Sequence, residues 1–262
     1  MPTLHDVLNF LERRAPLHLA EEWDNVGLLI GSRERNAARV MTCLTLTGEV
    51  AAEAVERGAN LVVTHHPLPF HPLQRITDHE AAGRVVLALI EARIAVYSAH
   101  TAFDSTADGI NEMWAHALRL GDLEPLVPNN ELPSVGAGRI GNLAVAKPLA
   151  ELAELVKGIV NSEELRGVGR EEASVTRIAI ACGSGGSLIE AAAAAGAELL
   201  LTGEASFHGC LAAAAHGMAL FLTGHYASER FAMERLAEEL AEAFPEVEAW
   251  ASRAEADPLR QW

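Results

Sequence analysis

The sequence has few cysteines, few aromatic side chains and no long hydrophobic run, and each shortage argues against a class of protein. The three cysteines, Cys43, Cys182 and Cys210, lack CxxC spacing, which disfavours a disulfide framework or a zinc–cysteine site and fits a reducing cytoplasm. No apolar run reaches the length of a membrane span, and none follows a basic start at the N-terminus. We therefore expect a cytoplasmic protein without a signal peptide or a membrane segment.

Positive charge is also scarce. The chain has 20 Lys and Arg residues against 36 Asp and Glu residues, which gives a formal net charge of −16. An acidic surface repels the phosphates of nucleic acids and of anionic membranes, so we expect neither as a partner. An anionic small molecule held at a bound cation remains compatible with this charge.

Half of the 262 residues are hydrophobic but only 5% are aromatic, so Ala, Leu, Val and Ile must build the core. Strand-like and helix-like segments alternate along the chain, which predicts an α/β fold with parallel-rich sheets flanked by helices. Residues 125–133 contain three prolines and two asparagines, typical of a linker. We expect a first lobe over 1–125 and a second over 126–225, with 226–262 as a candidate to pack back on the first.

The two halves of the chain resemble each other. Residues 39–64 align without a gap with 177–202, and both stretches contain a Gly-Ala turn before a Leu-rich or Val-rich strand. Residues 94–99 match 219–224 in the same way. Any two strand–helix–strand units look alike to some extent, but the ungapped register favours an internal duplication. The sequence thus predicts two similar α/β lobes.

Two adjacent histidines, His65 and His66, follow an apolar run that predicts a buried strand at 61–64. Neighbouring strand residues point to opposite faces, so both imidazoles converge on one site only if the strand has ended. Pro67 favours that ending, because it biases His66 toward extended or turn geometry. The carboxyl edge of a parallel sheet is where open α/β sheets bind ligands. Taken alone, the pair is equally compatible with a surface loop.

A histidine followed four residues later by a carboxylate occurs at two corresponding strand ends. The first such pair is His100 with Asp104, and the second is His225 with Glu229. Imidazole and carboxylate together suit divalent Zn, Fe, Mn, Ni or Co, and a carboxylate can bridge two ions. Asp104 or Glu229, taken alone, could simply cap a helix. His225, taken alone, could be a core histidine that donates to a carbonyl. Their recurrence beside the His-His pair favours metal binding.

Other strand ends carry weaker candidates. Gly183, Gly185 and Gly186 follow a strand and open a helix, where they either cradle a phosphate or form a tight turn. His208 and Glu204 follow the strand that corresponds to the His-His strand. Together with His100, they are candidates to support metal ligands or to transfer protons, although a plain helix start explains His208 and Glu204 equally well.

Several motifs occur in a fixed order: Glu-Trp-Asp-Asn-Val-Gly-Leu at 22–28, Thr-His-His-Pro-Leu at 64–68, His-Thr-Ala-Phe-Asp at 100–104 with Gly-Ile-Asn at 109–111, Thr-Gly-Glu at 202–204 with His208, and Gly-His-Tyr-Ala-Ser-Glu at 224–229. Together they resemble the Nif-three-like family, whose members are widely labelled GTP cyclohydrolase I type 2 homologues. The resemblance covers nearly the whole chain. It implies a toroidal homohexamer and a dinuclear metal centre, with two divalent ions per chain held by His65, His66, Asp104, His225 and Glu229.

The sequence departs from the family pattern at two places. Leu44-Thr45 stands where the family usually has Leu-Asp, and Ala102-Phe103 stands where it has Asn-Leu. Neither change removes an implied metal ligand, but both alter the surroundings. The resemblance implies a metal-dependent hydrolase that acts on a nucleotide or a related small molecule. If the cyclohydrolase label applies, water adds to the imidazole ring of a purine nucleotide and formate leaves. The alternative is a non-enzymatic metal-binding protein with a regulatory or interaction role.

Overall fold

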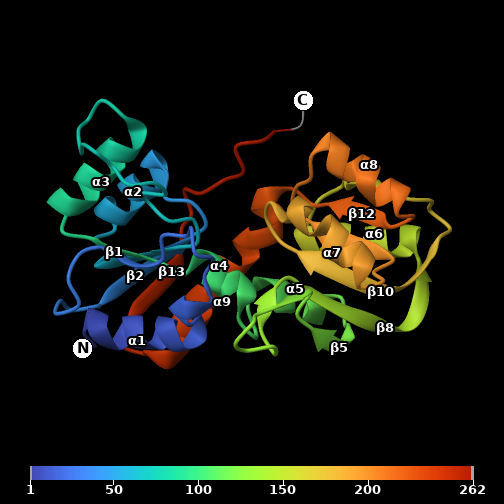
Figure 1. Cartoon of the computed structure of the whole chain (residues 1–262). Coiled ribbons are helices and arrows are strands. Elements are labelled where there is room, and N and C mark those ends of the chain that lie inside the picture. The colour runs from blue at the N-terminus through green and yellow to red at the C-terminus, as the bar shows by residue number, and fades with distance from the viewer. Residues whose placement is uncertain (1, 261–262) are drawn as a thin grey trace. The chain divides into compact units, whose positions relative to one another are not determined.

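The computed structural model describes residues 2–260, which form two compact units (Figure 1). Unit 1 comprises the residues up to Phe103 together with those from Arg230 onward, and unit 2 comprises Asp104–Glu229. The chain passes between them within α4 (His100–Ser105) and within α9 (His225–Ala243). These bounds differ from the predicted lobes, 1–125 and 126–225. The difference arises because the helix at 110–117 packs on the second sheet and the strand after residue 120 pairs with it.

Unit 1 is built on a five-stranded sheet of order β1-β4-β3-β2-β13. Strands β2, β3, β4 and β13 are parallel, and β1 pairs antiparallel with β4. Along the chain, the elements of this unit other than α4 and α9 are α1 (Leu4–Arg14), a 3-10 helix (Leu17–Leu19), β1 (Gly27–Ile30), β2 (Arg39–Cys43), α2 (Gly48–Glu56), β3 (Leu61–Thr64), α3 (Ala81–Glu91), β4 (Ala95–Ser98) and β13 (Glu248–Ala251).

Helix α1 begins with a capping box. Thr3 and Asp6 form a reciprocal capping box, in which the Asp6 carboxylate accepts from the Thr3 amide (2.8 Å) and the Thr3 hydroxyl accepts from the Asp6 amide (3.3 Å). The apolar stripe of Leu4, Val7 and Leu8 is buried. The helix is therefore fixed at its start by local hydrogen bonds and along its length by the core.

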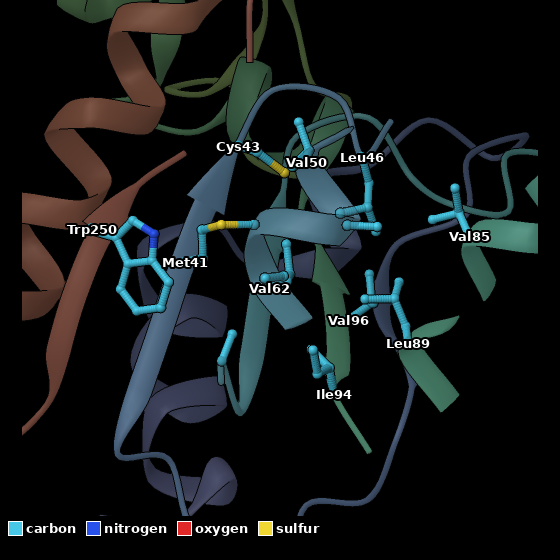
Figure 2. Packing of buried hydrophobic residues seen from close by; sticks show 13 residues of the cluster. Met41, Cys43, Leu46, Val50, Val62, Val85, Leu89, Ile94, Val96 and Trp250 are labelled. Carbon is cyan, nitrogen blue, oxygen red and sulfur yellow. The ribbon is translucent and has the colours of Figure 1, made fainter. Parts of the chain in front are cut away.

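The sheet of unit 1 is covered on both faces. Met41, Val62 and Val96 point to one side and pack against Val50 of α2 and Leu89 of α3 (Figure 2). On the other side, α1 and α9 cover the sheet (Figure 1), and the Thr42 hydroxyl donates to the Met233 carbonyl of α9 (2.6 Å). Because both faces are buried, the strands are continuous apolar runs rather than alternating ones.

Unit 2 contains a six-stranded mixed sheet of order β5-β8-β10-β11-β12-β9 and a small separate pair, β6 with β7. Strands β10, β11 and β12 are parallel, whereas β8 and β9 run antiparallel to their neighbours. Its elements are α5 (Ile110–Ala117), β5 (Gly121–Glu124), β6 (Val127–Pro128), β7 (Gly136–Ala137), β8 (Arg139–Pro148), α6 (Leu149–Val160), β9 (Arg166–Val168), β10 (Ser174–Ala181), a 3-10 helix (Gly185–Leu188), α7 (Ile189–Ala194), β11 (Leu199–Thr202), α8 (Phe207–Ala215) and β12 (Ala219–Leu222).

The predicted α/β class with parallel-rich sheets is confirmed. In both units, three consecutive strands are parallel and end in register, with Thr64 opposite Ser98 and Thr202 opposite Leu222. This correspondence is compatible with the internal duplication, which stays a prediction. None of the helices within residues 2–260 combines the length and the apolar composition that a membrane crossing requires.

Candidate functional site

Three imidazoles meet at the carboxyl edge of the sheet in unit 1. His65 and His66 follow β3, and His100 follows β4, which is the next strand of the sheet. The ring centroids are 5.2 Å apart for His65–His66, 5.1 Å for His65–His100 and 5.6 Å for His66–His100. Each ring offers a nitrogen within 4.8 Å of the others, so the three can hold one metal ion.

Backbone hydrogen bonds beyond the end of β3 place the first two histidines. The His65 amide donates to the Cys43 carbonyl (3.0 Å) and the His66 amide donates to the Leu44 carbonyl (2.9 Å). His65 is only 2% exposed, and its own carbonyl accepts from the Ser98 hydroxyl (2.6 Å). The peptide following β3 is thus held from both neighbouring strands, which lets two consecutive side chains reach one site.

Thr45 orients the second histidine. Its Oγ1 lies 2.7 Å from Nδ1 of His66, so the ring is fixed by a partner outside the cluster. Histidines that bind metals usually have such a partner on the second ring nitrogen, which sets the tautomer. Thr45 is one of the two departures from the family pattern, and its hydroxyl supplies this contact.

Asp24 orients the third histidine. Its Oδ1 lies 2.8 Å from Nδ1 of His100, and its Oδ2 accepts from the Thr101 amide (3.1 Å) and hydroxyl (2.5 Å). Burial raises the pKa of this carboxyl, but the hydrogen bonds from His100 and Thr101 outweigh that effect and lower the pKa to about 2. Asp24 is therefore a carboxylate at neutral pH. The sequence singled out His100 but gave no role to Asp24, which is 76 residues away from it along the chain.

Unit 2 brings together a second group of donors. His225 and Glu229 lie one turn apart at the start of α9, with Nε2 and Oε2 separated by 3.1 Å. Glu204, which follows β11, places Oε1 3.6 Å from Nδ1 of His225. The hydrogen bond that His225 donates to Glu229 raises the pKa of His225, although burial opposes the rise. Imidazole and carboxylate are thus paired within this unit.

Asp104 is held by the end of β10. The Cys182 thiol donates to Oδ1 of Asp104 (3.4 Å), and the Asn111 amide group donates to the Asp104 carbonyl (3.0 Å) while accepting from the Cys182 amide (2.8 Å). Burial, reinforced by the charge of Asp104, raises the pKa of the Cys182 thiol, so it stays protonated and donates. Sequence reasoning missed this contact, because no spacing rule relates residues 78 positions apart.

The glycines after β10 pack too closely against their neighbours to leave room for a side chain. Gly183 has a φ of +59°, and a Cβ there would lie 2.1 Å from Oε1 of Glu229. A Cβ on Gly185 would lie 2.4 Å from that of Ala181. A carboxylate in front of Gly183 favours the tight-turn alternative, and phosphate binding by Gly183, Gly185 and Gly186 stays a prediction. His208 is exposed on α8 and belongs to none of the donor clusters found within residues 2–260.

The donor chemistry of both units fits a borderline divalent metal. Unit 1 contributes three imidazoles, of which His65 is buried, and unit 2 contributes an imidazole with the carboxylates of Glu229 and Asp104. Mixed nitrogen and oxygen ligands of this kind bind Zn, Fe, Mn, Ni or Co, whereas Mg and Ca prefer oxygen alone.

Comparison with known proteins finds relatives that match nearly the whole chain. A curated protein of Clostridium perfringens named GTP cyclohydrolase 1 type 2 homolog is 33% identical over 257 residues, covering 98% of both chains. NIF3-like protein 1 of Drosophila melanogaster is 35% identical over 259 residues, covering 97% of this chain and 87% of its own.

A crystal structure of a Staphylococcus aureus hypothetical protein superposes with a TM-score of 0.89 at 26% identity and covers 99% of both chains. A Bacillus cereus protein related to NIF3 has the same fold, with a TM-score of 0.90 at 24% identity, covering 100% of this chain and 99% of its own. The family model described as Duf34/NIF3 (NGG1p interacting factor 3) matches residues 2–258. The resemblance found in the motifs is thereby confirmed, and the chain belongs to the Duf34/NIF3 family.

Proposed function

We propose that this protein is a dinuclear-metal-dependent hydrolase of a nucleotide or a related small molecule. The observation that carries the proposal is the cluster of His65, His66 and His100 at the carboxyl edge of the first sheet. Two divalent ions per chain, of the series Zn, Fe, Mn, Ni and Co, would be held by the ligands that the family resemblance implies. These ligands are His65, His66, Asp104, His225 and Glu229. The name of the relatives, GTP cyclohydrolase 1 type 2 homolog, supports a nucleotide as the substrate class.

Bound ions would lower the pKa of an attacking water and polarise the bond that it attacks. The residues around them have separate tasks. Thr45 orients His66, and Cys182 holds the carboxylate of Asp104. These partners prevent the ligands from rotating, as partners of metal ligands do in other metal sites.

His100 is suited to proton transfer. Asp24 is ionised and lies 2.8 Å from Nδ1 of His100, so it favours the tautomer that carries the proton on Nδ1. In that tautomer Nε2 accepts a proton, and Asp24 stabilises the imidazolium that forms. A His–Asp pair with this geometry acts as a general base in hydrolases. Glu204 and His208 stay weaker candidates, since both side chains are exposed.

The proposal extends to the assembly and its location. The family resemblance implies a homohexamer, and the three free cysteines fit a cytoplasmic protein. The second candidate function is a non-enzymatic metal-binding regulatory or interaction protein. The family description, which names an interacting factor, favours this alternative.

The test is the metal content per chain of the purified protein, measured beside hydrolysis of a panel of nucleotides and phosphoesters. We expect about two metals per chain, and we expect the double variant His65→Ala with Glu229→Ala to lose both the metals and one activity. His5→Ala removes an exposed histidine of α1 and should change neither. Metal without any activity would favour the interaction protein. No metal after reconstitution would reject the whole site.

A further inference from the structure

Two exposed aromatic side chains, Trp23 and Phe70, lie beside the histidine cluster of unit 1. Trp23 is 62% exposed and Phe70 is 43% exposed. Their ring centroids are 6.0 Å apart, and each lies 6.0 Å from the ring of His100. We call these two side chains the aromatic pair.

The backbone that carries the aromatic pair is held by hydrogen bonds, although the rings themselves face solvent. Trp23 directly precedes Asp24, whose carboxylate is bound by His100 and Thr101. Phe70 follows Pro69, whose carbonyl accepts from the Asn25 side chain (2.7 Å). The two segments are thus tied to each other and to the histidine cluster. The rings have a fixed place without being part of the core.

This exposure contrasts with the other tryptophans that the structure describes. Trp114 is fully buried and Trp250 is 8% exposed. Trp114 also donates its indole N–H to the Ser228 carbonyl (2.8 Å). A large exposed aromatic surface beside a group of potential metal ligands is a common feature of ligand sites, because the ring offers area at little cost in conformational entropy.

We propose that the aromatic pair is the stacking site for a planar heteroaromatic ring of the ligand that reacts beside His100. The inference rests on the proposed function and names the residues that recognise the substrate. The two rings are already in contact and are inclined by 43°, which leaves no slot for a third ring between them. The ligand ring therefore stacks on their outer faces, chiefly on Trp23. Stacking of this kind tolerates any base, because every base has a flat π-face.

Two other occupants fit less well. A cationic ligand would also bind an aromatic face, but divalent ions at the neighbouring histidines would repel it. The apolar surface of a second protein would have to cover Glu21 and Glu22, which are exposed next to Trp23. Burial of unpaired carboxylates is unfavourable. A neutral heteroaromatic ring is the occupant that is repelled neither by ions at the histidines nor by the carboxylates of Glu21 and Glu22.

Tryptophan fluorescence of the full chain provides the test, with guanosine and GTP as probes. We expect both to quench the fluorescence, and ribose 5-phosphate, which has no aromatic ring, to leave it unchanged. Trp23→Leu should abolish the quenching and weaken binding of GTP in calorimetry by about 10- to 100-fold. Trp23→Phe, which keeps a flat ring, should restore most of the affinity.

Controls separate this inference from the proposed function. Phe207→Leu removes a ring that is 73% exposed on α8 and should leave GTP binding unchanged. Metal content should be the same in Trp23→Leu as in the wild type.

If Trp23→Leu and Phe70→Leu both bind GTP as the wild type does, the inference is wrong even when metal and activity are intact. Binding of tetramethylammonium without guanosine, or a change of oligomer mass in Trp23→Leu without loss of GTP binding, would overturn it too. Loss of metal from the wild type would instead reject the proposed function, since guanosine needs no metal to stack.

Discussion

The histidines of unit 1 are oriented by residues that are remote from them along the chain. His65 and His66 are adjacent and precede a proline, so their convergence follows from local geometry. The partners of the ligands are remote in sequence: Thr45 lies 21 residues from His66, and Asp24 lies 76 residues from His100. Only the order of strands in the sheet brings these residues together. Ligand types can therefore be predicted from motifs, whereas the contacts that orient them cannot.

Asp24 should contribute a stability that depends on pH. Its folded pKa of about 2 is below the ordinary value of 3.8, so the contribution is present above pH 3.8 and is lost as the pH falls through about 2. A shift of this size corresponds to at most about 2 kcal/mol at pH 7, and solvent screening of the half-buried carboxyl reduces this value. We expect Asp24→Asn to unfold more easily in urea by about 1–2 kcal/mol at pH 7, and by about half as much at pH 3.

Asp78→Asn, which removes an exposed carboxylate of the same unit, is the control for the lost charge and should stay within about 0.5 kcal/mol of the wild type. A deficit of Asp24→Asn that does not change between pH 7 and pH 3 would contradict the lowered pKa. The variant would then act through packing alone.

Among the structural elements, the edges of the sheets were harder to predict than their centres. The central strands β3 and β11 are apolar runs, so their composition alone predicts buried strands. Strand β13 has only four residues within a polar tail, and it exists because it pairs with β2 about 200 residues earlier. Strand β6 lies within the predicted linker, and its partner β7 lies just beyond the end of that linker. The pattern of apolar residues thus predicts buried strands, and tertiary pairing decides the rest.

A single buried arginine fixes the start of unit 2. Arg139, at the first position of β8, is 2% exposed and donates to the carbonyls of Ser105, Thr106, Gly136 and Gly138 and to the Glu112 carboxylate. We expect Arg139→Met to lower the free energy of unfolding by about 3–5 kcal/mol, because it leaves a half-buried carboxylate and four carbonyls without their donor. Urea unfolding followed by circular dichroism measures the change.

Arg170→Met is the matched control, since Arg170 is exposed in the same unit and its removal should cost less than about 0.5 kcal/mol. The double variant Arg139→Met with Glu112→Gln should recover part of the loss by removing the unpaired charge. If Arg139→Met unfolds at the same urea concentration as the wild type, the arginine does not hold the segment that follows α4.

For the whole molecule, the net charge of −16 per chain bears on the proposed hexamer. Six copies of an acidic chain repel one another. The repulsion reaches about 8 Å at 0.15 M salt, but it reaches about 30 Å at 0.01 M, where screening is weaker. Two divalent ions per chain would offset a quarter of the charge. We therefore expect light scattering to give about six times the chain mass of 27.9 kDa at 0.15 M salt, and a smaller mass at 0.01 M.

The chain treated with a chelator should dissociate at a higher salt concentration than the chain loaded with metal, because it keeps the full charge. Sucrose at the osmolarity of the salt series controls for effects other than screening. A mass that is constant across the series at six chains would mean that apolar contacts outweigh the repulsion. A mass of one chain in every buffer would reject the hexamer and leave each chain to act alone. If the salt concentration at the midpoint of dissociation is the same with and without the chelator, the charge of the ions has no effect on assembly.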